Sequence, residues 1–227
     1  MLTRRMTSVS LVTLALLAAI GLSVSAVPCR ADMQNDVDRA VNILERFYNI
    51  RESSIPPAVL RDAEGLVIMW VIKAGFIVSG RGGSGIVVAR TGKHSWSGPS
   101  AIGTGGAGFG FQIGGEVTEF VLVLNTKGAV EAFSHGGNVS LGGQLSVAAG
   151  PVGRTAEAGV MPIAAVYTYS RSQGLFAGAS LEGTVVVTRN EANNEYYRRE
   201  VDPWRILSGE VKPPKGAQRL IKVLSRY

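Results

Sequence analysis

The stretch Trp96–Asn125, WSGPSAIGTGGAGFGFQIGGEVTEFVLVLN, joins a glycine-dense segment directly to the most apolar run of the chain. In residues 108–114 the large side chains occupy odd positions and the glycines mostly even ones, so an extended backbone has side chains on one face and bare backbone on the other. Glycine inside a strand often marks a bend, or the close approach of a second backbone or a ligand. The stretch therefore predicts a strand with one open face, covered either by a ligand or by a helix such as residues 217–224. It favours a binding surface over an active site.

Short β-rich runs separated by glycine lie on both sides of this stretch. Upstream, residues 66–90 contain LVIMWVI, FIVSG and IVVAR, with a turn expected at 73–75 and a loop at 81–85. Downstream, similar runs lie at 117–125, 130–134, 144–149, 163–170, 176–181 and 184–189. Such runs are typical of an antiparallel meander, and no helical periodicity interrupts them. The sequence therefore predicts an α+β protein whose curled antiparallel sheet closes toward a barrel.

Helices are predicted on both sides of this sheet in the chain. Apolar residues recur at intervals of three and four over 35–49, with acids in the first turn, where the helix dipole favours them. The run Ser54-Ile55-Pro56-Pro57 predicts the start of a short helix that Gly65 can end. A short helix over 203–207 and a longer one over 217–224 are predicted near the C-terminus. These helices are expected to pack on the sheet.

The composition indicates one folded domain. The chain has 227 residues, of which 46% are hydrophobic and 18% charged, and this suits a single sizeable core. Its 29 glycines and 9 prolines follow no three-residue period, which excludes collagen, and the long apolar runs argue against disorder. No linker divides residues 32–227, which are predicted to form the domain.

Residues 1–31 have the layout of a secretory signal peptide. Arg4 and Arg5 precede an apolar run over 9–24 and then small residues, with cleavage expected after Ala26 or Ala31. The alternative is a retained membrane anchor, although the run is short for a span. Removing residues 1–31 takes away three arginines and no acid, so the formal charge falls from +6 to +3. The sequence thus predicts an exported protein of the periplasm or cell envelope.

Cys29 is the only cysteine of the chain. An intrachain disulfide and a metal site of the paired-cysteine type are therefore impossible. A lipoprotein signal has a small residue immediately before its modified cysteine, and Pro28 occupies that place here. A lipid anchor on Cys29 is not expected.

Residues that usually carry chemistry are scarce. Residues 103–108 fit G-x-G-x-x-G, but the strand before the motif and the helix after it that a nucleotide site needs are missing. His94 and His135 lie in loops without a carboxylate or cysteine near them in sequence. Glu116 and Glu119 are three apart on a predicted strand and thus point to opposite faces. We predict no enzymatic activity, no metal, no cofactor and no nucleic-acid partner.

The window from Gly65 to Gly115 contains no Asp or Glu. Glycine turns expose backbone N–H groups to anions, and neighbouring Arg or Lys side chains add charge-assisted bonds to phosphate. The alternative is that the cations of this window are ordinary surface charges with acidic partners elsewhere in the fold. The predicted contacts to a lipid head group, within and beyond the window, are Lys73, Arg81, Lys93, Arg154 and Arg171. Four aromatic residues are predicted to be either core or membrane contacts, namely Trp70, Phe76, Trp96 and Phe111.

The sequence resembles the SYLF domain family over roughly residues 43–224. The blocks that resemble the family lie in its order, and they are Ile55-Pro56 with Val59-Leu60, Lys73-Ala74-Gly75-Phe76, Gly83-Ser84-Gly85, Trp96-Ser97 with Pro99-Ser100, Gly110 with Gln112-Ile113-Gly114, residues 149–154 (AGPVGR), Tyr169-Ser170-Arg171-Ser172 with Gly174-Leu175-Phe176, and Asn194 with Tyr196-Tyr197. This family includes exported bacterial proteins as well as eukaryotic proteins that bind phosphoinositides and, in yeast, actin. The resemblance implies a lipid-binding module and supplies no catalytic residues.

Two functions are therefore expected ahead of an enzyme such as a hydrolase. The first is an exported, non-enzymatic module that binds anionic phospholipid or phosphoinositide-like head groups at a membrane surface. The alternative is a scaffold of the cell envelope that docks a protein partner, because residues 205–226 are strongly basic. Actin is not expected as a partner, since the sequence contains an export signal and no SH3 or FYVE-like domain.

Overall fold

The computed structural model describes residues 32–49, 55–151, 164–174 and 184–226, and for residues 49, 75–79, 107–114 and 173–174 it describes the backbone alone. The predicted signal peptide with Cys29, the predicted head-group residue Arg154 and the predicted strand 176–181 lie outside these residues. Residues Asp32–Tyr227 group into one compact unit.

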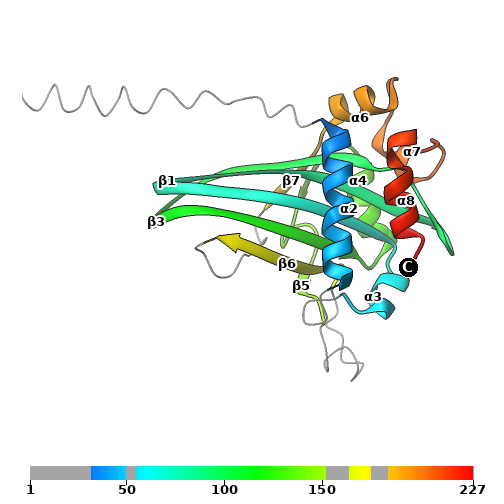
Figure 1. Ribbon diagram of the computed structural model, residues 1–227. Helices are drawn as coiled ribbons and strands as arrows, with labels where there is room; N and C mark the ends of the chain where they lie inside the picture. Colours follow the sequence, from blue (N-terminus) through cyan, green and yellow to red (C-terminus); the bar gives the residue numbers. More distant parts are fainter. Residues whose placement is uncertain (1–31, 50–54, 152–163, 175–183, 227) are drawn as a thin grey trace, which may run out of the picture. The chain divides into compact units, whose positions relative to one another are not determined.

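Two long antiparallel strands form the centre of the molecule (Figure 1). β1 (Gly65–Gly92) pairs with β3 (Ser100–Leu124) from Gly65 opposite Leu124 to Val87 opposite Ser100. The two ends of β1 lie side by side, because the Arg90 N–H donates to the Glu64 carbonyl (2.8 Å). β1 therefore bends back on itself, and the register shift between Phe76 and Val78 marks the bend. The turn and the loop predicted at 73–75 and 81–85 are wrong, since both segments are paired strand.

Glycine allows the two halves of β1 to approach each other closely. A Cβ atom on Gly83 would lie 2.3 Å from the Trp70 carbonyl oxygen, and one on Gly85 would lie 2.3 Å from that of Ile68. A side chain at either position would overlap the backbone of the outgoing half. Glycines that suggest a loop in the sequence thus permit a tightly curled sheet.

The remaining strands extend this pair into a strongly curled sheet that forms a half-barrel. They are β2 (Ser95–Trp96), β4 (Asn138–Ser140), β5 (Val147–Ala149), β6 (Val166–Gly174) and β7 (Val185–Thr188). The order is β2-β1-β3-β6-β5, while β7 pairs with both β3 and β4. All of these pairs are antiparallel except β5–β6. The predicted α+β class, with a curled sheet closing toward a barrel, is confirmed.

Helices lie on the N-terminal and C-terminal sides of the sheet in the chain. They are α2 (Met33–Asn49), α3 (Pro57–Arg61), α4 (Lys127–Ser134), α6 (Asn190–Tyr197), α7 (Pro203–Leu207), the 3₁₀ turn η1 (Lys215–Ala217) and α8 (Gln218–Leu224). The helices predicted at 35–49, 203–207 and 217–224, and the short one after Pro56, are confirmed within a few residues. The strand predicted at 130–134 is wrong, because Thr126 accepts a hydrogen bond from the Ala129 N–H and caps α4. The prediction also lacked α6.

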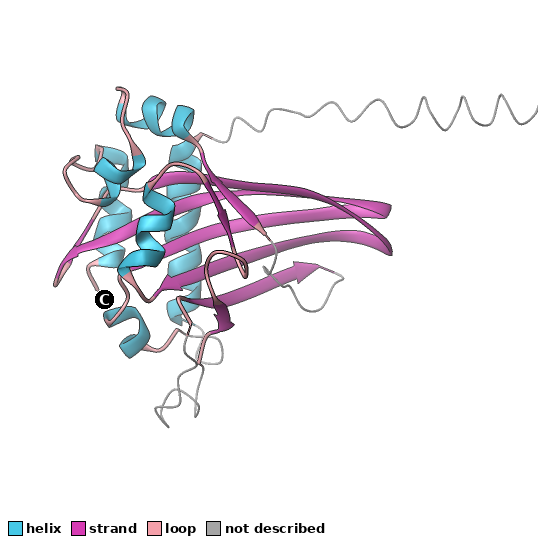
Figure 2. Ribbon diagram, turned by 180° about the vertical axis from the view of Figure 1, so that it is seen from behind, coloured by secondary structure: helices cyan, strands magenta, loops and turns pink. Residues whose placement is uncertain are grey.

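Side-chain alternation divides the core between the two faces of the sheet. Leu66, Ile68, Val121 and Val123 pack with the apolar stripe of α2 and with α8. Val67, Met69, Phe120 and Leu122 point to the opposite face, where α4 packs (Figure 2). α8 packs against α2. Among the described residues, no helix combines the length and the apolar character needed to cross the membrane.

Candidate binding surface

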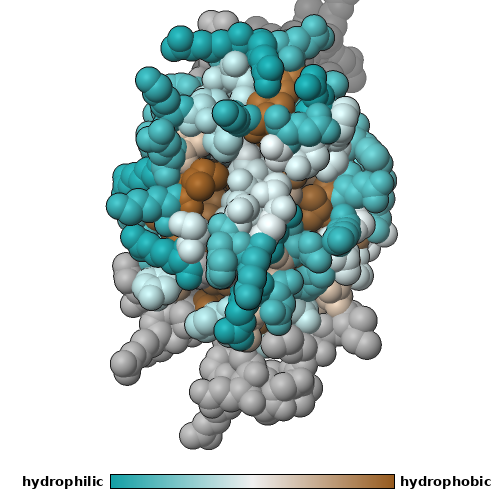
Figure 3. Space-filling model, turned by 90° about the vertical axis from the view of Figure 1, so that its right-hand side faces the viewer, coloured by the Kyte–Doolittle hydropathy of each residue, from teal (hydrophilic) through white to brown (hydrophobic). Residues whose placement is uncertain are grey.

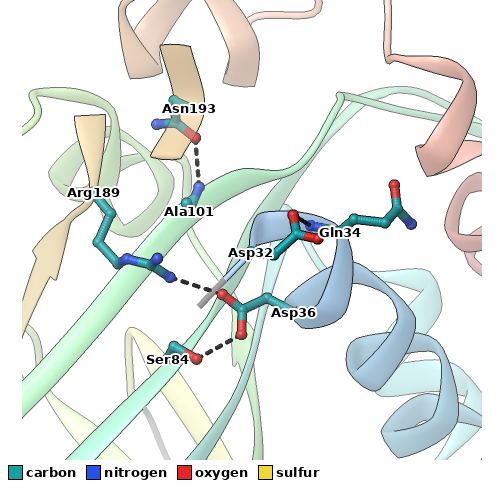
Figure 4. Close-up of polar contacts among 7 residues, drawn as sticks. All are labelled: Asp32, Gln34, Asp36, Ser84, Ala101, Arg189 and Asn193. Carbon is teal, nitrogen blue, oxygen red and sulfur yellow. Dashed lines mark hydrogen bonds and ion pairs between the residues drawn. The ribbon is translucent and has the colours of Figure 1, made fainter. Parts of the chain in front are cut away.

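A buried ion pair fixes the start of α2 on the sheet (Figure 4). Asp36, which is only 3% exposed, accepts hydrogen bonds from the Ser84 hydroxyl (2.5 Å) and from Arg189 Nη1 (2.8 Å). Close by, the Asn193 side-chain oxygen accepts a hydrogen bond from the Ala101 N–H (2.7 Å). These bonds join α2, β1, β3 and α6. They fix where α2 lies on the sheet and hence which residues of its face are covered.

At the border of the α2-covered area, a row of charged and aromatic residues crosses the sheet. Trp70, Glu119 and Arg171 are direct cross-strand neighbours on β1, β3 and β6. α2 adds two cations to this row, because the Arg39 guanidinium lies 4.0 Å from the centre of the Trp70 ring and Arg46 Nη2 donates to Glu119 Oε1. The row thus contains three arginines and one acid, and it has an excess of positive charge.

The next rows along the strands are apolar and uncovered. Ile72 and Val117 form the adjacent cross-strand pair and are 42% and 37% exposed. Ala74 and Gly115 follow as the next such pair, and a Cβ on Gly115 would have no atom within 4 Å. Side-chain alternation puts all four residues on the face that carries α2. We call these four residues, together with Trp70 and Arg171, the distal face.

The fold does not bring the predicted head-group residues together. Arg171 belongs to the distal face, whereas alternation places Lys73 and Arg81 on the opposite face of β1. Arg81 lies across Gly106, whose Cβ would sit 2.9 Å from Arg81 Nε. Lys93 is exposed in the turn between β1 and β2, at the other end of the strand.

The predicted aromatic residues also have different environments. Trp96 is 6% exposed and belongs to the core, with the Arg90 guanidinium 4.3 Å from its ring centre. Arg90 also donates to the carbonyls of Leu60 and Ala63 (both 2.8 Å). Burial lowers the pKa of Arg90 against the opposing effect of Glu64 and Asp62. Trp70 is half-buried on the distal face, and Phe76 and Phe111 flank the bend between the paired halves of β1 and β3.

Sequence reasoning did not single out Arg39, Arg46, Ile72 or Val117 as site residues. Arg39 and Arg46 are seven residues apart, a spacing that puts both on one side of a helix, so a signal was present for them. Ile72 and Val117 become neighbours only through the register of β1 and β3. That register is not visible in the sequence before the fold is known.

The described part of the chain holds no cluster of His, Cys, Asp or Glu suited to a metal ion. His135 lies 3.6 Å from Glu131 on the exposed surface of α4 and its C-terminal cap. Glu116 is buried and accepts a hydrogen bond from the Thr118 hydroxyl (3.0 Å), which in turn lies 3.2 Å from the Ser172 hydroxyl. A carboxylate held by hydroxyl groups, without a histidine or a second acid beside it in these contacts, forms no recognisable catalytic set.

A second charged region lies at the opposite end of the long strands and is called the helical end. It consists of residues 203–226, which include α7, η1 and α8, together with the turn after β1. Its exposed cations are Lys93, Arg205, Lys212, Lys215, Arg219, Lys222 and Arg226. Figure 3 shows this side of the molecule as a mainly hydrophilic surface with small apolar areas.

Comparison with known proteins identifies the family. The model of the Ysc84 family, described as "Las17-binding protein actin regulator", matches residues 105–227. An SH3 domain-containing protein of Schizosaccharomyces pombe is 48% identical over 207 residues, which are 87% of this chain and 48% of that protein. Human SH3 domain-containing YSC84-like protein 1 is 45% identical over 207 residues, or 88% of this chain and 60% of that protein. LAS seventeen-binding protein 3 of Saccharomyces cerevisiae is 44% identical over 206 residues, or 87% and 45%.

These matches bear on two expectations, namely that actin is no partner and that the protein is not an enzyme. The expectation that actin is no partner is contradicted, because the matching family is described as an actin regulator. None of the three relatives is named as an enzyme. The chain spans about half the length of the curated relatives it matches. Because the family model matches residues 105–227, which are more than half of the chain, the chain belongs to the Ysc84 family, which is the SYLF family that its sequence blocks resemble.

Proposed function

We propose that this chain is a non-catalytic binding module that engages an anionic phospholipid surface through the distal face. The observation that carries the proposal is the exposed apolar pair Ile72–Val117 immediately beside a row with three arginines. Moving exposed apolar side chains from water into the lipid interface lowers the free energy. Each nearby Lys or Arg contributes about 1 kcal/mol of attraction to an anionic membrane. The half-buried ring of Trp70 adds apolar surface at the same boundary.

The bend of the β1–β3 pair extends this argument along the strands. Figure 1 shows the pair running out beyond the helices to this bend. The sequence there is rich in large apolar residues, including Phe76, Phe109 and Phe111. A projecting apolar segment next to an uncovered apolar face suits shallow contact with a membrane. Lys73 and Arg81 lie on either side of the bend and on the face of β1 opposite to the distal face, so they remain proposed head-group contacts of the bend and not of the distal face.

Vesicle sedimentation tests the proposal with a matched pair of variants. The variant I72T/V117T makes the distal face polar while keeping β-branched side chains, and V185T/V187T makes the same change at the exposed valines of β7. Retention by vesicles containing phosphatidylglycerol is expected to fall with salt and to fall in I72T/V117T alone. Retention that is absent, independent of salt or equally reduced in both variants would overturn the proposal.

The second candidate function is binding to actin or to an actin-regulating protein. It rests on the description of the family and on the name of LAS seventeen-binding protein 3. Co-sedimentation of the chain with filamentous actin tests it directly. Binding to filaments that I72T/V117T leaves unchanged would assign actin to another surface, and no co-sedimentation would reject this candidate for the chain.

We also propose that residues 1–31 direct export to the periplasm or cell envelope. The support is the order of charged, apolar and small residues in that segment. N-terminal sequencing of the protein recovered from the cell envelope should begin at Val27 or Asp32. A protein that keeps Met1 or Leu2 would contradict the proposal.

A further inference from the structure

We infer that the helical end is a second docking surface, and that it takes an acidic helical segment of a partner protein. The first support is the charge of residues 203–226. This segment contains six cations, namely Arg205, Lys212, Lys215, Arg219, Lys222 and Arg226, and one acid, Glu210. All of these side chains belong to exposed residues. A surface with so strong an excess of one sign attracts partners of the opposite sign and repels those of the same sign.

Most of these cations are left without an acidic partner by the fold. Arg205 pairs with Glu210 (3.3 Å) and Arg219 with Glu45 (3.2 Å). Within the described part of the chain, no ion pair involves the remaining cations, which are Lys212, Lys215, Lys222 and Arg226. Internal salt bridges therefore do not account for this charge.

The geometry of α8 arranges part of the charge in a line. Leu220, Val223 and Leu224 point into the core that α2 shares. Arg219, Lys222 and Arg226 follow each other at intervals of three and four, so they lie on one outward side of the helix and its C-terminal end. A partner helix with acids at the same spacing could place its carboxylates opposite them.

Two neighbouring features enlarge the surface. The loop after α7 lies against the end of β1, because a Cβ on Gly209 would be 2.8 Å from Thr91 Cγ2. Lys93, in the turn that follows, is therefore part of the same end of the molecule. Trp204 of α7 is 48% exposed, although tryptophan is usually largely buried. Exposed tryptophan and arginine are the residue types that most often dominate the energy of protein interfaces.

A protein segment fits this surface better than a membrane does. The helical end lies at the end of the long strands remote from the distal face (Figure 1), and its apolar areas are small and scattered (Figure 3). If the distal face binds the membrane, the helical end is left in water and free for a soluble partner. This choice of occupant rests on the proposed function, whereas the charge and the geometry of the surface do not.

Fluorescence anisotropy of the full chain with two labelled peptides tests the inference. Both peptides have the same composition, but one carries its glutamates at intervals of three and four on one side of a helix and the other distributes them around it. The variant K222Q/R226Q removes two cations from the line on α8. Its control, R198N/R199Q, removes two exposed cations after α6, with asparagine chosen because residue 198 has a φ of 55°.

The one-sided peptide is expected to bind more tightly than its isomer, with an affinity that falls as salt rises. K222Q/R226Q should weaken this binding about fivefold, as expected for two exposed ion pairs, and the control should leave it unchanged. Equal affinity for both peptides, or equal losses in both variants, would overturn the inference. So would a loss of vesicle retention in K222Q/R226Q without a change in peptide affinity, because the surface would then bind lipid.

The two proposals can fail separately. If I72T/V117T retains full vesicle binding while K222Q/R226Q loses peptide affinity, the proposed function is wrong and the second surface remains. If I72T/V117T loses vesicle binding and neither peptide binds, the membrane function remains and the second surface is wrong.

Discussion

The carboxylate of Asp36 and the guanidinium of Arg189, 153 residues apart in sequence, form a buried ion pair of 2.8 Å. The Asp36 side chain is 3% exposed and that of Arg189 is 22% exposed, so the acid depends on its partner more than the arginine does. The pair joins the first helix of the fold to the segment after β7. The pair thus holds α2 on the sheet through one residue from the N-terminal part of the chain and one from the C-terminal part.

Replacing Arg189 by methionine should destabilise the protein strongly. The change leaves a buried carboxylate with the Ser84 hydroxyl as its hydrogen-bond donor, and uncompensated buried charges cost about 3–5 kcal/mol. Urea unfolding followed by circular dichroism measures the loss. The control is E210Q, which breaks an exposed ion pair with Arg205 and should cost less than about 1 kcal/mol. Similar small losses in both variants would mean that the Asp36–Arg189 pair does not hold α2.

The close approach within β1 predicts a sharp difference between two glycines three residues apart. In G85A the new methyl group would lie 2.3 Å from the Ile68 carbonyl oxygen and 2.6 Å from the Met69 Cα, so the halves of β1 must separate. Such overpacking costs about 1–3 kcal/mol. In G82A the methyl group would meet nothing within 4 Å. The free energy of unfolding of this variant should therefore lie within about 0.5 kcal/mol of the parent value or above it. Equal midpoints in urea would show that β1 does not fold back as described.

Two neighbouring tyrosines of α6 differ in what their hydroxyl groups do. The Tyr197 hydroxyl donates to the Pro99 carbonyl (2.9 Å), whereas the buried Tyr196 hydroxyl has no hydrogen-bond partner among the described residues. Y197F should therefore cost about 1 kcal/mol by leaving the Pro99 carbonyl with one bond fewer. Y196F should be neutral or slightly stabilising, since it removes a buried polar group without a partner. Thermal unfolding of both variants at neutral pH checks the order, and the reverse order would contradict these contacts.

Elements that depend on local pattern were predictable from the sequence. α2 follows from the spacing of apolar residues over 35–49, and α7 from the proline that starts it. The strand predicted at 130–134 was wrong because Val130 and Phe133 suit a strand, whereas the capping residue Thr126 decides for a helix. Local propensity was a weaker signal than the cap.

The candidate site depends on register, and this was not predictable. Lys73 and Arg171 were expected to share one surface, but alternation places them on opposite faces of the sheet. The glycines at 83 and 85 suggest a loop in the sequence, because the need for glycine becomes visible only when the other half of β1 lies against them. Long-range contact, not composition, determines the role of each of these residues.

The buried tyrosines predict a loss of stability at alkaline pH. Burial raises the pKa of Tyr196 to about 12, with smaller contributions from Asp38 and Asp32, and burial also raises the pKa of Tyr169 and Tyr197. In the unfolded chain these phenols ionise near pH 10, while in the folded protein they keep their protons to higher pH. The folded state therefore binds more protons above pH 10, and stability falls as pH rises through that region.

This alkaline loss can be assigned to single tyrosines by comparing the parent with Y196F from pH 8 to pH 11. Each tyrosine with a raised pKa contributes at most about 1.4 kcal/mol per pH unit to the slope of unfolding free energy above pH 10. The two proteins differ only at residue 196, so the difference between the two urea curves reports Tyr196 together with its effect on the pKa of the neighbouring Tyr197. The curves should run parallel below pH 9, and the parent should lose stability faster above pH 10. Parallel curves up to pH 11 would mean that the Tyr196 hydroxyl ionises in the folded protein as it does in water, and that α6 does not bury it.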